Sequence, residues 1–151
     1  MGEITREITV RKAVPEDSDA VYEIGTCCFS DAWRRETVIH DMAGPHSQYF
    51  TACQNGNVVG YACFWFVLDE AQLVNIGVRP ENRRQGIAKK LLDAGLEEAR
   101  IRKAKTLFLE VRVSNLPAQS LYKQYGLQVK GIRRDVYELP REDGYIMSRE
   151  I

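Results

Sequence analysis

Glu110 interrupts a stretch of the sequence whose pattern is otherwise that of an apolar strand. Residues 106–113 carry apolar side chains at every odd position, and Glu110 shares the other face with Phe108 and Arg112. Because an unpaired charge is costly to bury, a carboxylate in such a strand is either paired or functional. Two interpretations stay open: an ion pair with Arg112 or with a basic residue elsewhere, or a general base that removes a proton from an attacking amine.

Tyr122 is the second side chain singled out, in a short helix predicted to begin after Asn115 and to end at Gly126. Asparagine is a favourable helix N-cap, and glycine is favourable just past a helix end. For an isolated tyrosine, packing in the core beside Leu121 and Tyr125 is the ordinary explanation. The residue type alone therefore assigns no chemistry to Tyr122.

The segment 78–88 has the pattern of a strand end, a polar loop and the start of an amphipathic helix at Gly86. The free N–H groups of a helix start bind anions, and Gly86 and Ala88 leave room for a ligand close to the backbone. Positive side chains are unfavourable at a bare helix start, so their presence indicates a bound anion, although a plain surface helix is the alternative. Four basic residues surround this start: Arg83, Arg84, Lys89 and Lys90.

The same segment resembles a family signature. Arg83-x-x-Gly86-x-Ala88 is similar to the Q/R-x-x-G-x-G/A signature of the GNAT superfamily of N-acetyltransferases, in which this loop holds the pyrophosphate of acetyl-CoA. The likeness covers nearly the whole chain and is strongest from about Leu68 to Tyr125. Further motifs resemble the RimI branch of that superfamily: residues 74–78, 109–112, 114–115 and 121–122.

The resemblance implies roles for individual residues. Glu110 would be the general base, directly or through water, and Tyr122 the general acid near the cofactor sulfur. The two central parallel strands would splay apart, and the backbone of residues 76–78 would pair with pantetheine and help to hold the oxyanion. Position 77 is more often Ala in the family, and here it is Gly77. The implied contacts to the co-substrate acetyl-CoA are Ile76, Gly77, Val78, Arg83, Arg84, Gln85, Gly86, Ile87, Ala88, Lys89 and Asn115.

The acceptor is expected to be an amine, and the resemblance favours the N-terminal α-amine of a protein, with ribosomal proteins among the candidates. Trp33 and Tyr137 are candidate walls of the acceptor groove, and the charged residues 133–135 could contact a peptide. The family often has a proline before Trp33 and two aromatic residues where only Tyr137 stands. Two alternatives remain: a small-molecule or lysine acetyltransferase, and a non-catalytic acyl-CoA-binding module.

The elements that must position these residues alternate along the chain as β-α-α-β-β-β-α-β-α-β-β. This order predicts a single α/β domain over residues 1–151, with a mixed, mostly antiparallel sheet and helices on both faces. Asn55-Gly56 predicts a two-residue hairpin turn. Strands are expected over residues 8–12, 49–53, 57–67, 71–78, 106–113, 127–132 and from 144 onward. Helices are expected after Pro15, from residue 30 or 31 to 42, from 84 to about 103, and between 115 and 126.

Composition excludes several classes of protein. The 151 residues have a formal net charge of +0, which is unlike a nucleic-acid-binding protein, and no apolar run is long enough to span a membrane. Four cysteines without metal-binding spacing, and two histidines with no partner in the sequence, predict no metal site. Free thiols and the absence of a signal-peptide pattern predict a cytoplasmic protein. We expect a monomer or weak homodimer with neither nucleic acid nor membrane as partner.

Overall fold

A computed structural model describes residues 7–151 of the chain and confirms the predicted order of elements. Two short 3-10 turns, Pro15–Asp17 and Pro80–Asn82, precede the first and third helices. The helices are α1 (Ser18–Cys28), α2 (Arg35–Met42), α3 (Ile87–Ile101) and α4 (Leu116–Gln124). The strands are β1 (Thr9–Lys12), β2 (Ser47–Gln54), β3 (Asn57–Val67), β4 (Glu70–Val78), β5 (Thr106–Arg112), β6 (Gln128–Glu138) and β7 (Arg141–Glu150).

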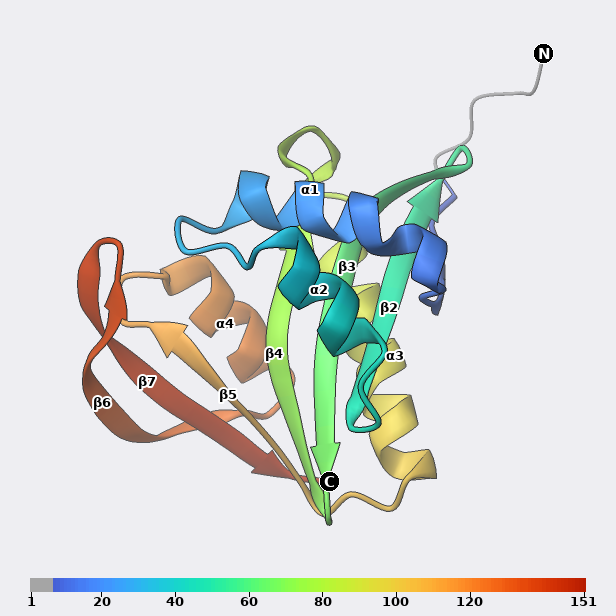
Figure 1. The fold of residues 1–151 in the computed structure, drawn as a ribbon. Coiled ribbons are helices and arrows are strands. Elements are labelled where there is room, and N and C mark those ends of the chain that lie inside the picture. The colour runs from blue at the N-terminus through green and yellow to red at the C-terminus, as the bar shows by residue number, and fades with distance from the viewer. Residues whose placement is uncertain (1–6) are drawn as a thin grey trace.

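One sheet holds all seven strands, in the order β1-β2-β3-β4-β5-β7-β6. Within the described chain, β4 and β5 form the one parallel pair, and the other pairs are antiparallel. Helices α1 and α2 cover one face of the sheet, and α3 and α4 lie behind it (Figure 1). The sheet is therefore mixed, mostly antiparallel and covered on both faces, as predicted.

Two apolar clusters fill the spaces between the sheet and its helices. Side chains of α3 and α4, including Leu91 and Tyr122, pack with the inner face of the central strands in the larger cluster. The smaller cluster joins Ile24 of α1 and Val38 of α2 to the opposite face of β2 and β3. Alternation along β5 sends Leu107, Leu109 and Val111 into the larger cluster, so Glu110 faces the other way, as the sequence pattern predicts.

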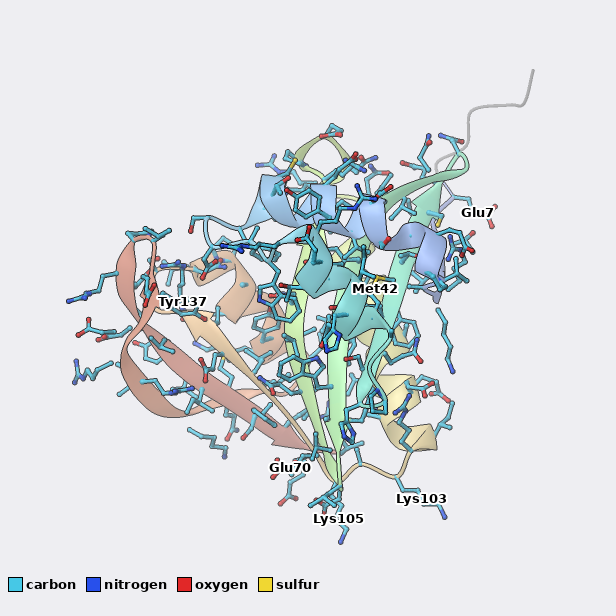
Figure 2. The ribbon with its side chains drawn as sticks, viewed as in Figure 1. Glu7, Met42, Glu70, Lys103, Lys105 and Tyr137 are labelled. Carbon is cyan, nitrogen blue, oxygen red and sulfur yellow. The ribbon has the colours of Figure 1, made fainter. Side chains whose placement is uncertain are left out.

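The sheet is split at its centre. Strands β4 and β5 are paired at three positions, residues 70–72 with residues 106–108, and at no later position of the described chain. Glu70 and Lys105 lie together at the closed end of this split (Figure 2), and β5 diverges from β4 toward the other end (Figure 1). A bulge at Val74, where the register with β3 shifts, accompanies the divergence. The splay expected from the family resemblance is present.

Several element boundaries differ from those predicted. The second helix begins at Arg35 rather than near residue 30, because residues 29–34 form a loop in which Ser30 donates a hydrogen bond to the carbonyl of Leu139. Helix α3 begins at Ile87 rather than residue 84, because Arg84 and Gly86 have positive φ angles of 66° and 76°, outside the helical region.

The C-terminal hairpin is longer than predicted. Strand β6 continues past residue 132 to Glu138, and β7 begins at Arg141 rather than at residue 144. Two register irregularities, one after Val129 and one after Arg133, interrupt the pairing and hide the strand from a simple alternation pattern.

Candidate active site

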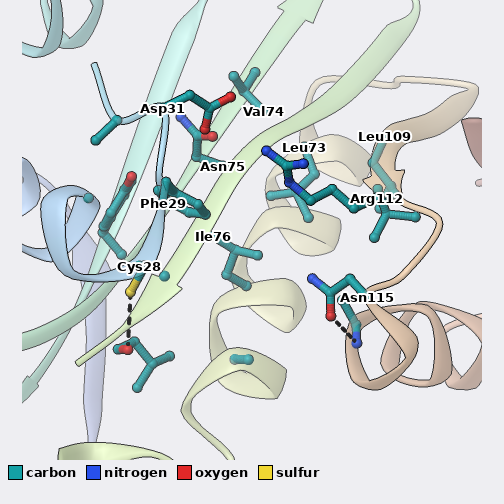
Figure 3. Close-up of a pocket in the computed structure, with 18 of the residues that line it drawn as sticks. Cys28, Phe29, Asp31, Leu73, Val74, Asn75, Ile76, Leu109, Arg112 and Asn115 are labelled. Atoms are coloured by element: carbon teal, nitrogen blue, oxygen red, sulfur yellow. Dashed lines mark hydrogen bonds between the residues drawn. The ribbon is translucent and has the colours of Figure 1, made fainter. Parts of the chain in front are cut away.

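A cleft of about 700 Å³ opens where β4 and β5 diverge. Residues 73–78 of β4 and 109–112 of β5 form its sides, and the loop after α1 and the start of α4 complete it. Figure 3 shows Cys28, Phe29 and Asp31 on one side of β4, with Leu109, Arg112 and Asn115 on the other. Because β5 no longer pairs with β4 here, one edge of each strand is free to bind a ligand.

The cleft reaches the N-terminus of α3, where Arg83 and Ala88 line it; residues 83–89 are called here the α3 end. The first bond of the helix runs from the Lys90 N–H to the Gly86 carbonyl at 3.1 Å, so within the described chain the N–H groups of residues 86–89 have no internal partner. The first turn contains no acidic residue, and no side chain caps it. This arrangement leaves donors and a positive helix end available to an anion.

Gly86 has the left-handed conformation that starts this helix, with φ of 76°. A β-carbon built there would meet no atom within 4 Å, so the space beside the backbone is open. Glycine adopts this conformation without strain, whereas most side chains do not. Gly86 therefore serves the loop conformation and leaves room for a ligand.

An amide network holds the loop before α3. Asn82 donates to the Gln54 side-chain oxygen at 3.1 Å, Gln54 donates to the Gln85 oxygen at 3.2 Å, and Gln85 donates to the Asn82 carbonyl at 3.2 Å. The Gln85 side chain thus stabilises the loop and is not part of the cleft wall. Sequence reasoning did not identify Gln54, since it comes from the end of β2.

The residues predicted to contact acetyl-CoA divide into two groups. Those that line the cleft are Ile76, Gly77, Val78, Arg83, Ala88 and Asn115. Those outside its lining are Arg84, Gln85, Gly86, Ile87 and Lys89. The Ile87 side chain is buried in the core and 2% exposed, so only its backbone N–H is available to a ligand at the α3 end. Asn115 also caps α4 by accepting a bond from the Ala118 N–H at 3.2 Å, as predicted.

Gly77 allows α1 to pack closely on β4. A β-carbon at this position would lie 3.3 Å from both Cys28 Sγ and Ile24 Cγ2, tighter than ordinary contact. The carbonyl of Val78 accepts bonds from Cys28 Sγ at 3.3 Å and Arg83 Nε at 3.2 Å. This carbonyl is therefore already engaged by protein groups.

Glu110 lines the cleft, with 26% of its side chain exposed. It accepts a hydrogen bond from the guanidinium of Arg133 on β6. The ion pair left open by the sequence therefore exists, but its partner is Arg133 and not Arg112. Because Arg133 is 57% exposed, the pair is solvated and weak enough to exchange with another cation.

Tyr122 lies on α4 at the back of the cleft and is 7% exposed. Burial, with a smaller contribution from Tyr137, raises the pKa of its hydroxyl above the ordinary value for tyrosine. The hydroxyl makes no hydrogen bond to any other group of the described chain. It remains protonated at neutral pH and is available as a donor within the cleft.

The other end of the cleft, called here the aromatic end, has Trp33 on one wall and Tyr137 on the other. Tyr137 lies on the β6–β7 side of the molecule and Met42 marks the end of α2 opposite it (Figure 2). Burial, together with the nearby charge of Glu110, raises the pKa of Tyr137 to about 12. Both predicted groove residues thus face the same cavity.

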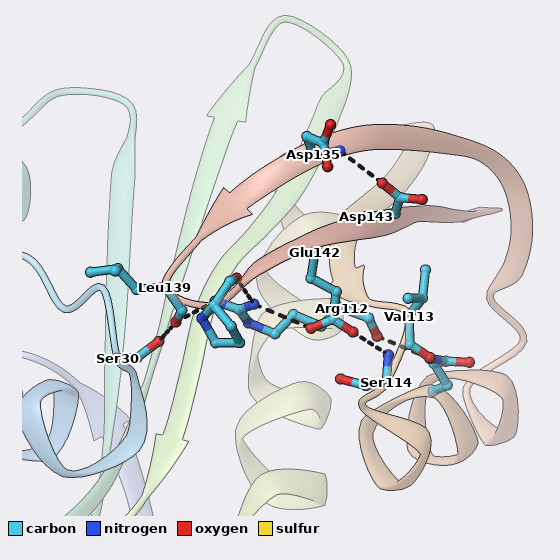
Figure 4. A network of polar contacts seen from close by, with 10 residues as sticks. Ser30, Arg112, Val113, Ser114, Asp135, Leu139, Glu142 and Asp143 are labelled. Carbon is cyan, nitrogen blue, oxygen red and sulfur yellow. Dashed lines mark hydrogen bonds and ion pairs between the residues drawn. The ribbon is translucent and has the colours of Figure 1, made fainter.

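Arg112 fastens the turn between β6 and β7 to this end of the cleft. Its guanidinium donates to the carbonyls of Pro140 at 2.8 Å and Leu139 at 3.1 Å, and it lies 4.3 Å from the centre of the Tyr137 ring. Figure 4 shows this network, in which Ser30 also donates to Leu139. Sequence reasoning missed this role because the partners are far apart along the chain.

Asp143 of β7 holds two of the hairpin residues that were predicted to contact a peptide, one by its side chain and one by its backbone. Arg134 pairs with Asp143 at 3.2 Å, and the Asp135 N–H donates to the same carboxylate at 2.8 Å. Asp31 of the loop after α1, a carboxylate that the sequence analysis did not select, lines the cleft instead. It was missed because that loop was predicted as helix.

Comparison with known proteins decides the family. The model of the acetyltransferase (GNAT) family matches residues 18–127. The chain belongs to the GNAT family. A Bacillus subtilis relative is 40% identical over 139 residues, which is 91% of this chain and 92% of the relative. The Escherichia coli ribosomal protein bS18-alanine N-acetyltransferase is 36% identical over 145 residues, covering 95% of this chain and 97% of the relative.

Solved GNAT structures have the same fold. The crystal structure of the Escherichia coli ribosomal-protein-S18-alanine N-acetyltransferase superposes with a TM-score of 0.89 and 35% identity, covering 96% of this chain and 94% of that one. An Elizabethkingia anophelis GNAT acetyltransferase with acetyl-CoA bound has a TM-score of 0.77 at 17% identity, covering 95% and 98%, a likeness of fold alone.

In residues 7–151, no group of three or more histidine, cysteine, aspartate or glutamate side chains is placed to hold a metal ion. No helix in that range is both long and apolar enough to cross a membrane.

Proposed function

We propose that this GNAT acetyltransferase moves the acetyl group of acetyl-CoA to the N-terminal α-amine of a protein, with a ribosomal protein as the first candidate acceptor in the cytoplasm. One observation carries the proposal. A single cleft is lined by Arg83 and Ala88 at the α3 end, by Glu110 and Tyr122, and by Trp33 and Tyr137.

Acetyl-CoA fits the α3 end of this cleft. Its diphosphate would accept hydrogen bonds from the free N–H groups of residues 86–89, next to the positive charge of Arg83. Its pantetheine arm would lie along the unpaired edge of β4, where the backbone of Ile76 and Gly77 is exposed to the cleft. A solved acetyltransferase structure of the same fold has acetyl-CoA bound, which supports acetyl-CoA as the co-substrate.

The chemistry proposed for the site is direct transfer. A neutral amine attacks the thioester carbonyl, the C–S bond breaks, and the sulfur leaves as a thiolate that needs a proton. Glu110 accepts the proton of the incoming ammonium, directly or through water, once that ammonium displaces Arg133 from the carboxylate. Tyr122, kept protonated by burial, donates its proton to the departing sulfur, and the second proton released by the amine as the amide forms restores the Tyr122 hydroxyl through solvent.

A protein N-terminus is favoured as the acceptor for two reasons. Several relatives that match almost the full length of this chain are named ribosomal protein bS18-alanine N-acetyltransferases. The aromatic end also offers Trp33 and Tyr137 as two facing walls, which suit an extended peptide entering by its first residues. Asp31 and Glu110 add negative charge for an ammonium group.

Mass spectrometry of peptides incubated with the enzyme and acetyl-CoA tests the proposal. We expect a peptide with the N-terminal sequence of the organism's own bS18 protein to gain one acetyl group on its α-amine. The same peptide with a blocked N-terminus and an internal lysine is the matched control and should gain none. Acetylation of the lysine, or of polyamines in preference to peptides, would contradict an N-terminal acceptor, and the absence of any transfer would favour a binding module.

A further inference from the structure

Asp41, near the end of α2, is a half-buried carboxylate with no cationic partner among the described residues. Three neutral groups donate to it instead. The Tyr49 hydroxyl lies 2.6 Å from one oxygen and the Trp65 indole N–H lies 3.1 Å from the other, with Cys63 Sγ at 3.5 Å. Because partial burial of an unpaired charge is costly, these hydrogen bonds are needed to keep the carboxylate in this place.

The donors remain neutral around this carboxylate. Burial is the main cause that raises the pKa of Tyr49 and of Cys63 above their ordinary values. Both side chains therefore stay protonated at neutral pH and donate hydrogen bonds to Asp41. The cluster is a fixed set of hydrogen bonds rather than an exchangeable ion pair.

This cluster reaches the cleft through aromatic contacts. The Trp65 ring stacks on Trp33 with centroids 6.2 Å apart and planes at 26°, and Tyr49 stacks on Tyr61 at 6.2 Å and 12°. Trp33, Tyr49 and Tyr61 line the cleft, whereas Asp41 and Trp65 do not. Asp41 therefore contacts residues that hold the aromatic end in place, and it does not line the cleft where an acceptor would bind.

Helix α2 depends on such contacts for its position. It has eight residues, and no side chain caps its N-terminus, so it is too short to be stable by itself. The loop of residues 29–34 connects it to α1 and carries Trp33. The hydrogen bonds that Asp41 accepts from Tyr49 on β2 and from Trp65 on β3 attach the helix to the sheet.

We infer that Asp41 is a positioning residue for the acceptor: it fixes Trp65, and through Trp65 the Trp33 wall, and thereby sets acceptor affinity without contacting the acceptor. The inference rests on the proposed function only in placing the acceptor at the aromatic end. Its structural part, the link from Asp41 to Trp33, can be tested without turnover.

The chain has two tryptophans, which are Trp33 and Trp65, so NMR of the indole groups reports on this link directly. In Asp41→Asn we expect the Trp65 indole N–H resonance to move upfield and the Trp33 ring resonances to shift with it. Glu36→Gln, which removes an exposed carboxylate of the same helix, is the matched control and should change neither. Trp33 resonances that stay unchanged in Asp41→Asn would overturn the link.

Kinetics with an acceptor peptide test the role itself. We expect Asp41→Asn to raise the KM for the peptide about fivefold, equivalent to roughly 1 kcal/mol, with kcat and acetyl-CoA affinity changed less than about twofold. Asp41→Leu, checked for folding by circular dichroism, should raise the KM for the peptide further. In a Trp33→Ala background, Asp41→Asn should cause no additional rise in this KM.

The outcomes separate this inference from the proposed function. Normal peptide turnover with an unchanged KM in Asp41→Asn would overturn the inference alone, as would an equal rise of KM in the Trp33→Ala background. A wild-type enzyme that acetylates no peptide would overturn the acceptor role together with the proposed function.

Discussion

The α3 end of the cleft comes from one short stretch of chain, residues 83–89, supported by Gln54 of β2, whereas the aromatic end is assembled from several segments far apart in sequence. The local conformation of Gly86 and of the helix that follows it shapes the α3 end. The aromatic end needs the loop of residues 29–34, Arg112 of β5 and the 137–140 turn to meet. Cofactor binding should therefore tolerate changes elsewhere in the fold, and acceptor binding should not.

The largest effect is expected between the two ends, at the reacting groups. Glu110→Gln should lower kcat by about 10²–10⁴-fold, the usual contribution of a general base, with acetyl-CoA affinity nearly intact. Steady-state kinetics and calorimetry measure the two quantities. Arg133→Gln removes the ion-pair partner but keeps the carboxylate, so it should lower kcat far less. An equal loss in both variants would show that the ion pair, and not a base, is what matters.

Tyr122→Phe should lower kcat by about 10²-fold, because the departing thiolate loses its proton donor. Pre-steady-state measurement of the chemical step gives this number without interference from product release. Tyr145→Phe, which removes a hydroxyl from β7 outside the cleft, is the control. Unchanged chemistry in Tyr122→Phe would leave Tyr122 with only a packing role.

Gly86→Asp should weaken acetyl-CoA binding by about tenfold or more, through repulsion between its carboxylate and the diphosphate. Calorimetry with Gly86→Asn separates charge from shape, because asparagine has the same size and tolerates the left-handed conformation. We expect Gly86→Asn to bind acetyl-CoA much more tightly than Gly86→Asp. Equal affinities for the two variants would argue against an anion at the α3 end.

The smallest effect belongs to the aromatic end. Arg112→Lys should raise the peptide KM about threefold to tenfold while acetyl-CoA affinity stays the same, because a lysine cannot hold two carbonyls and stack on Tyr137 at once. Arg134→Lys is the control on the exposed side of the hairpin. A change in acetyl-CoA affinity instead would remove the distinction between the two ends.

The sequence predicted the order of elements and the split sheet well, because periodicity, the Asn55-Gly56 turn and the family signature are local signals. It failed where distant contacts override local preference. The second helix was predicted from residue 30 or 31, yet residues 29–34 form a loop in which Ser30 is bound to the carbonyl of Leu139. The irregular register of β6 concealed the longer C-terminal hairpin.

The candidate site shows the same division. Glu110, Tyr122, Trp33 and Tyr137 were all selected from the sequence, and all four line one cleft. The partner of Glu110 could not be predicted, because Arg133 reaches it only through the pairing of β6 with β7 and of β7 with β5. Side chains whose role is to hold others, such as Gln54 and Arg112, carry no local signal.

NMR titration of the backbone amides with acetyl-CoA tests the central claim most directly. We predict that the largest shifts occur at residues 86–89 and 76–78, where the helix start and the free edge of β4 face the cleft, while β1 is unaffected. Saturable binding that leaves residues 86–89 unmoved and shifts amides elsewhere would contradict it.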